Sequence, residues 1–166
     1  MFRTIEDFQQ GWAYESEATL KLLDALTDAS LRQPVAPGGR TLGRLAWHIV
    51  LSLREMLGTA GVSIAGPDQA DLVPTEAKVI AHHYRTSAKA LGPAVAARWT
   101  DAMLLETIPM YGEQWTRGAT LASLVVHQAH HRGQMTVLMR QAGLRVPGIY
   151  GPAKEEWAAM GMPAQE

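Results

Sequence analysis

The segment from residue 127 to residue 134 contains three of the six histidines in the chain, His127, His130 and His131. On a helix that turns by about 100° per residue, His127 and His131 lie on the side of the apolar residues, and His130 lies on the outer side. Two imidazoles four residues apart on one helix face can bind the same metal ion. A pair of hydrogen-bonded core histidines would have the same spacing, so the spacing alone leaves both interpretations open.

A catalytic type of zinc site takes three protein ligands, so a metal site here requires a third residue from another part of the chain. His48 is the leading candidate, because it lies at the edge of an apolar helix face beside Leu45 and Ser52. His83 is the rival, because it adjoins a second apolar stripe that includes Tyr84. The pattern permits either histidine to point inward and does not choose between them.

The composition limits the chemistry that can accompany such a site. The chain has 166 residues and no cysteine, which excludes thiolate nucleophiles and sulfur-ligated zinc, so any metal must be bound by nitrogen and oxygen atoms. The formal charge of −1, from 15 basic and 16 acidic residues, gives no reason to expect binding to nucleic acid or to an anionic membrane. Motifs for a nucleophile elbow, a phosphate-binding loop or a dinucleotide fold do not occur.

The length of the chain suits one domain, and we expect residues 1–166 to form it. The N-terminal residues include acids where a secretory signal would need an apolar stretch, and no segment approaches the ~18 apolar residues of a membrane span. We therefore expect a cytoplasmic protein.

Four segments carry apolar residues every three or four positions, which is the spacing of one helix face. They span about residues 4–28, residues 42–59, a stretch from about residue 75, and residues 121–142. The third helix should kink or break at Gly92-Pro93, because proline lacks the N–H that continues a helix. The pattern predicts an all-α fold, a four-helix bundle.

The segments between the expected helices are rich in glycine and proline. Residues 61–74 form a connection long enough to cross the end of a bundle, and residues 109–117 should be irregular. Gly143 suits the position just after the last helix, because glycine adopts the left-handed conformation without strain. The C-terminal tail should also be irregular, with a short helix at residues 154–160. No strand-like alternation is long enough to build a sheet.

Three parts of the sequence resemble the DinB family, within the DinB/YfiT-like superfamily of metalloproteins. The closest resemblance covers residues 121–143, with the motif His127-x-x-x-His131-Arg132-Gly133-Gln134 and the ending Leu138-Met139-Arg140-Gln141-Ala142-Gly143. Residues 146–152 resemble the tail of many members, and residues 42–50 resemble the second helix of the family, which carries a single ligand histidine.

The resemblance implies a divalent metal ion, zinc or nickel, bound by His48, His127 and His131 in a four-helix bundle that forms a homodimer. It also implies either a metal-dependent enzyme or a non-catalytic metal-binding protein of the stress response. In the enzyme, the metal would activate water or a low-molecular-weight thiol for S-transfer or related chemistry on a small-molecule substrate. The family name refers to damage-inducible expression and implies no contact with DNA.

Four further residues have expected roles around this site. Arg132 should be a surface charge rather than a substrate clamp. Gln134 is either a hydrogen-bond partner of a ligand histidine, near His127, or an exposed side chain. Trp47 and Leu51 lie off the main apolar stripe of their helix and could mark a dimer surface.

With an ordinary histidine pKa of about 6.5, the metal site should be largely empty at pH 5, where a chelator should have little effect on the melting temperature.

Overall fold

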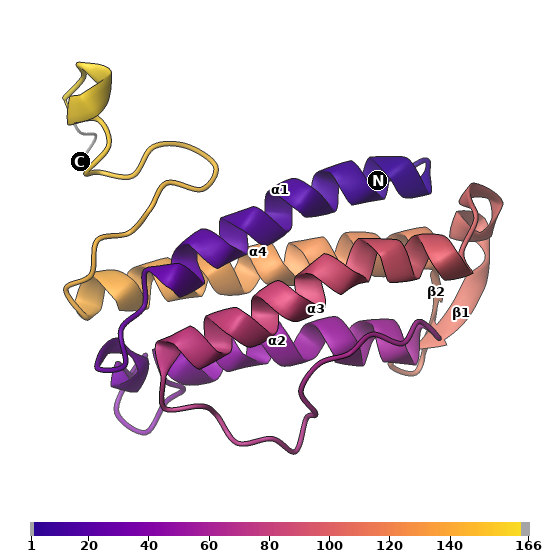
Figure 1. Ribbon diagram of the computed structural model, residues 1–166, viewed down its shortest axis with the longest axis horizontal. Coiled ribbons are helices and arrows are strands. Elements are labelled where there is room, and N and C mark those ends of the chain that lie inside the picture. The colour runs from indigo at the N-terminus through magenta and orange to yellow at the C-terminus, as the bar shows by residue number, and fades with distance from the viewer. Residues whose placement is uncertain (1, 164–166) are drawn as a thin grey trace.

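Four long helices dominate the computed structural model, which describes residues 2–163 (Figure 1). Helix α1 packs against α3 and α4, and α2 also packs against α3 and α4, so the four helices enclose one core. The all-α four-helix bundle predicted from the sequence is confirmed. The helices are α1 (Ile5–Asp24), α2 (Leu42–Thr59), α3 (Ala77–Arg98) and α4 (Arg117–Gln141), with short 3-10 helices η1 (Ser30–Arg32), η2 (Asp101–Leu105) and η3 (Ala158–Met160).

Threonine side chains mark the start of three of the four long helices. The hydroxyl oxygens of Thr4, Thr41 and Thr116 accept hydrogen bonds from the backbone N–H three residues further along, which would otherwise have no partner. At the other end of α4, Gly143 has a φ of 73°, as its predicted position after the helix requires. None of the helices within residues 2–163 is long and apolar enough to cross a membrane.

Helix α3 continues through Gly92 and Pro93 without the predicted break. Side chains of α1 bind backbone carbonyls in this part of α3: Trp12 Nε1 donates to Ala88 O at 2.9 Å, and Gln9 Nε2 donates to Gly92 O at 3.2 Å. This packing stabilises the helical path around the proline, whose own N–H is missing.

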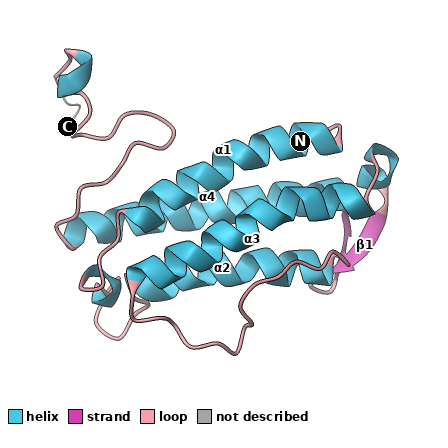
Figure 2. Ribbon diagram, viewed as in Figure 1, coloured by secondary structure: helices cyan, strands magenta, loops and turns pink. Residues whose placement is uncertain are grey.

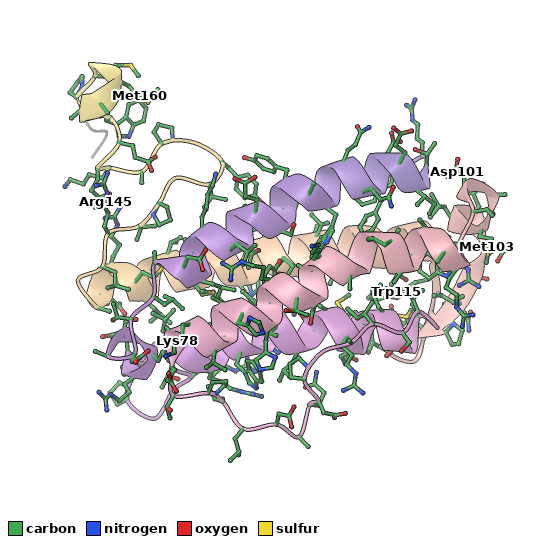
Figure 3. The ribbon with its side chains drawn as sticks, viewed as in Figure 1. Lys78, Asp101, Met103, Trp115, Arg145 and Met160 are labelled. Atoms are coloured by element: carbon green, nitrogen blue, oxygen red, sulfur yellow. The ribbon has the colours of Figure 1, made fainter. Side chains whose placement is uncertain are left out.

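Residues 109–117, expected to be irregular, include part of an antiparallel β-hairpin and the first residue of α4, so that expectation was wrong (Figure 2). Strands β1 (Thr107–Met110) and β2 (Glu113–Thr116) are joined by Tyr111 and Gly112, which both have positive φ angles, 52° and 84°. This is the two-residue turn that suits hairpins, and the Tyr111 hydroxyl donates to Glu55 Oε2 at 2.7 Å. Figure 3 shows Asp101, Met103 and Trp115 together at this end of the bundle.

The connection between α2 and α3 runs along the outside of the bundle. It covers Trp47, whose Nε1 donates to Asp71 O at 3.3 Å. Trp47 and Leu51 are buried, so the suggestion that they mark a dimer surface was wrong. The homodimer itself stays a prediction.

The ends of two predicted elements differ from the structure. Helix α1 ends at Asp24 rather than near residue 28, because Thr27 and Ser30 exchange side-chain hydrogen bonds in a turn that leads into η1. In the C-terminal tail, which Figure 1 shows leaving the bundle after α4, the short helix predicted at residues 154–160 is limited to η3.

Candidate metal centre

The structure brings together His48 of α2 with His127 and His131 of α4. The Nε2 atom of His127 lies 3.1 Å from the Nε2 atom of His48 and 3.1 Å from that of His131. Ligand atoms of the three residues all lie within 4.8 Å of one another. The three rings therefore point their nitrogen lone pairs at one small volume between α2 and α4.

The spacing of these nitrogens fits a transition metal. Two imidazole nitrogens at ~2.0–2.1 Å from a tetrahedral zinc ion are separated by about 3.3 Å. The 3.1 Å separations in this cluster are close to that value. Because three imidazoles also suit nickel and other divalent metals of the first transition row, the donors define a class of metals rather than one element.

The surroundings keep the three rings neutral, which is the form that binds a metal. Burial lowers the pKa of His48 to about 4, with smaller contributions from the nearby His131 and His127. Burial also lowers the pKa of His127 to about 4, followed by the charges of His131 and His130. The pKa of His131 is lowered mainly by burial, although its contact with Gln134 acts in the opposite direction. At neutral pH each ring is therefore uncharged and has one nitrogen lone pair available for coordination.

Gln134 orients one of the rings. Its Oε1 lies 2.7 Å from Nδ1 of His131, so this nitrogen carries the proton and donates to the amide oxygen, while Nε2 faces the cluster. The other end of the same amide contacts His130 Nε2 at 3.1 Å, and His130 is exposed, as predicted. Gln134 is thus a partner of His131, rather than of His127 as its helical phase suggested, and it is also exposed. Within residues 2–163, the buried Nδ1 of His127 has no hydrogen-bond partner.

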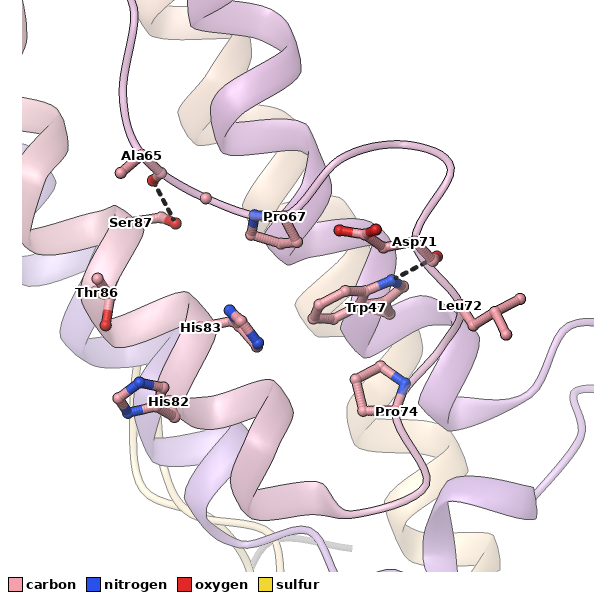
Figure 4. Close-up of a pocket in the computed structure, with 11 residues that line it drawn as sticks. Trp47, Ala65, Pro67, Asp71, Leu72, Pro74, His82, His83, Thr86 and Ser87 are labelled. Atoms are coloured by element: carbon pink, nitrogen blue, oxygen red, sulfur yellow. Dashed lines mark hydrogen bonds between the residues drawn. The ribbon is translucent and has the colours of Figure 1, made fainter.

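His83, the rival candidate for the third ligand, does not lie in the histidine cluster. It lines a separate cavity of about 480 Å³ between α3 and the connection that precedes it. Figure 4 shows its ring facing Trp47, and the two ring centres are 5.5 Å apart in an edge-on arrangement. The converging group of the described chain therefore contains His48 and not His83.

Arg132 is buried, with 2% of its surface exposed, so the prediction of a surface charge was wrong. It forms an ion pair with Glu15 of α1, contacts the Tyr150 hydroxyl in the tail, and donates to Thr19 Oγ1 at 2.8 Å. The helical phase contained a signal for this position, because Arg132 lies about 60° from the centre of the apolar face, closer than His127 at about 80°.

Gln128 is a second buried polar residue that the sequence reasoning did not identify. Its Nε2 donates to Ile49 O at 3.2 Å and to Ser52 Oγ at 3.1 Å, and its Oε1 accepts from Tyr84 Oη at 3.1 Å. These bonds join α2, α3 and α4 next to the ligand histidines in sequence. They hold α2 and α4 in the register that brings the three imidazoles together.

A family model of the DinB family matches residues 1–166. The chain belongs to the DinB family. Among DinB relatives, the uncharacterized protein YrdA of Bacillus subtilis (strain 168) is 48% identical over 164 residues, which cover 99% of this chain and 98% of YrdA.

Solved DinB structures agree with this assignment. The crystal structure of a DinB-like protein from Bacillus cereus ATCC 10987 is 49% identical, covers 90% of this chain and 100% of its own, and has a TM-score of 0.86. A DinB-like protein from Bacillus subtilis, YjoA, is 18% identical, covers 88% of this chain and 99% of its own, and has a TM-score of 0.67, which shows a shared fold.

Proposed function

We propose that this DinB-family protein binds one divalent metal ion, zinc or nickel, through His48, His127 and His131, and that it is a metal-dependent enzyme. The observation that carries the proposal is the convergence of three neutral imidazoles from two helices that pack against each other, with Nε2 of His127 3.1 Å from Nε2 of His48 and 3.1 Å from Nε2 of His131. Burial and Gln134 prepare these nitrogens for coordination before any ion arrives.

The number of donors supports catalysis. Structural zinc sites usually have four protein ligands, whereas catalytic sites have three and leave one position for water or substrate. The converging group here consists of three histidines. A bound ion of this kind lowers the pKa of water or of a thiol, so that either becomes a nucleophile near neutral pH.

A low-molecular-weight thiol is the proposed cosubstrate. The chain contains no cysteine, so a sulfur nucleophile must come from a second molecule. His48 and His127 are partly exposed, which allows an external molecule to reach the cluster. The proposed reaction class is therefore S-transfer or a related reaction on a small molecule, with water as the other candidate nucleophile.

The alternative is a non-catalytic protein in which the ion stabilises the fold. The observation that favours it is that His48 lies on α2 and the other two ligands lie on α4, so a bound ion would tie the two helices together.

Elemental analysis of protein purified without an affinity tag tests the metal site, with His127→Ala as the disrupted variant and His130→Ala as the matched control. We expect about one metal per chain in the wild type and the control, and little in His127→Ala. A screen for thiol transfer with the metal restored then separates the two functions. Turnover that disappears in His127→Ala supports the enzyme, and stoichiometric metal without turnover supports the structural role.

A further inference from the structure

A second cavity, of about 420 Å³, adjoins the histidine cluster. Gln134, which contacts His131 Nδ1, lines the cavity and separates it from the cluster, since none of the three histidines is among the lining residues. Leu45, another lining residue, lies one helical turn before His48. The volume is in the range of small-molecule sites. The walls include Val35 and Arg40 from the segment before α2, Leu45 of α2, and Gln134, Val137, Leu138 and Gln141 of α4.

The cavity has an apolar interior and an apolar entrance. Leu45 and Leu138 are buried in its inner wall, while Val35 and Val137 are 55% and 57% exposed. When an apolar ligand covers large apolar side chains that are exposed beside a cavity, the burial of their surface favours binding of the ligand. The cavity therefore suits a ligand with an apolar body.

Arg40 is the one charged residue in the lining. Within residues 2–163, it forms no ion pair with a carboxylate. A guanidinium binds a carboxylate through two parallel N–H donors, and a single cation matches a monoanion better than a doubly charged phosphate.

We propose that this cavity binds the substrate of the metal centre, and that the substrate is a small amphipathic carboxylate. Its carboxylate lies on Arg40, and its apolar body packs against Leu45, Val137 and Leu138. This inference rests on the proposed function, because the cavity gains a role in catalysis only through the adjoining histidines.

The larger cavity, lined by His83, is less suited to such a ligand. Two of its polar side chains already bind backbone carbonyls: Trp47 Nε1 donates to Asp71 O, and Ser87 Oγ donates to Ala65 O (Figure 4). Its one carboxylate, on Asp71, would repel an anion.

Calorimetric titration with 4-phenylbutyrate, and with the neutral 4-phenylbutan-1-ol for comparison, tests the proposal on both metal-free and metal-loaded protein. We expect Arg40→Gln to weaken binding of the carboxylate by about five- to tenfold and to leave the alcohol unchanged, because one charge-assisted contact is lost. Val137→Asp should weaken both probes, since it removes apolar surface at an exposed position. Arg44→Gln is the matched control: it removes the same charge one turn away, outside the lining.

The outcomes separate the cavity from the metal centre. The cavity assignment is wrong if neither probe binds at millimolar concentration, or if Arg40→Gln binds 4-phenylbutyrate as tightly as the wild type. It is also wrong if Arg44→Gln loses as much affinity for 4-phenylbutyrate as Arg40→Gln does. Each of these results can occur while elemental analysis still finds one metal per chain. A wild type that takes up no metal, yet binds the carboxylate through Arg40, would overturn the metal centre and leave the carboxylate preference of the cavity standing.

Discussion

Lowering the pH from 7.5 to 5 should weaken metal binding only modestly. A proton competes with the metal for each imidazole nitrogen, so affinity falls as the pH drops through the pKa of each ring in the folded, metal-free protein. Burial lowers that pKa to about 4 for both His48 and His127. These two rings therefore stay neutral at pH 5, well below the pH at which a free histidine takes up its proton.

The expected size follows from the same pKa values. Protonation of one ring with an ordinary pKa of about 6.5 would lower the metal affinity roughly 30-fold at pH 5. Protonation of three such rings would lower it roughly 30,000-fold. Because the pKa of His48 and of His127 is about 4, these two rings together lower the metal affinity only about 1.2-fold at pH 5. His131 has a lowered pKa as well, so it contributes less than the roughly 30-fold loss of an ordinary ring. The total fall in affinity from pH 7.5 to 5 should stay below about 30-fold, and the loss should become steep only below about pH 4.

Equilibrium dialysis against zinc or nickel at pH 7.5, 6, 5 and 4, followed by elemental analysis, measures this profile. The prediction replaces the expectation, based on an ordinary histidine pKa, that the site is nearly empty at pH 5. A chelator should therefore still lower the melting temperature at that pH. A fall of more than about 1,000-fold between pH 7.5 and 5 would refute the argument from burial, because three ordinary imidazoles would then describe the site better.

Other measurements test the remaining parts of the site. His131→Ala should lose most of the bound metal, like His127→Ala, whereas His130→Ala keeps it; elemental analysis decides, and metal loss in His130→Ala alone would reverse the assigned helix face. At neutral pH, free metal at 100 times its dissociation constant should stabilise the fold by about 2.7 kcal/mol, measured as a chelator-sensitive melting temperature. The metal-free protein should lose stability to urea as the pH falls from 6.5 towards 4, because unfolded histidines gain protons that folded His127 does not accept. Arg132→Met should lower the free energy of unfolding by about 3–5 kcal/mol, since Glu15 loses its buried partner, and the double variant with Glu15→Met should recover part of this loss.

Periodicity and helical phase predicted much of the fold and part of the site. The phase of α4 directed His127 and His131 inward and His130 outward, and the structure agrees. The choice of His48 over His83 came from family resemblance, because the apolar pattern of each helix permits either ring to turn inward. Which histidine joins the cluster depends on which faces of α2 and α3 pack toward α4, and this is a property of the tertiary structure.

Two errors came from interpreting glycine and proline only as local breaks. Pro109 and Gly112 suggested an irregular segment, but Gly112 instead supplies one of the positive φ angles that a tight hairpin requires. Pro93 suggested a kink or a break, and the break does not occur, because contacts from α1 maintain α3 there. The outcome at Pro93 depended on partners distant in sequence, whereas the hairpin is local, because its strands pair residues such as Thr107 and Thr116.

Arg132 shows where phase deserved more weight than residue type. Its position on α4 directed it inward, whereas its charge favoured the surface, because a buried charge is costly without a partner. The partner is Glu15, 117 residues away, with Thr19 one turn further along α1. Glu15 and Thr19 are four residues apart, so they lie on the same side of α1. An arginine on the apolar side of a helix therefore predicts a carboxylate on the inner side of a neighbouring helix. A search of the other three helices for such a carboxylate would have made Glu15 a candidate before the fold was known.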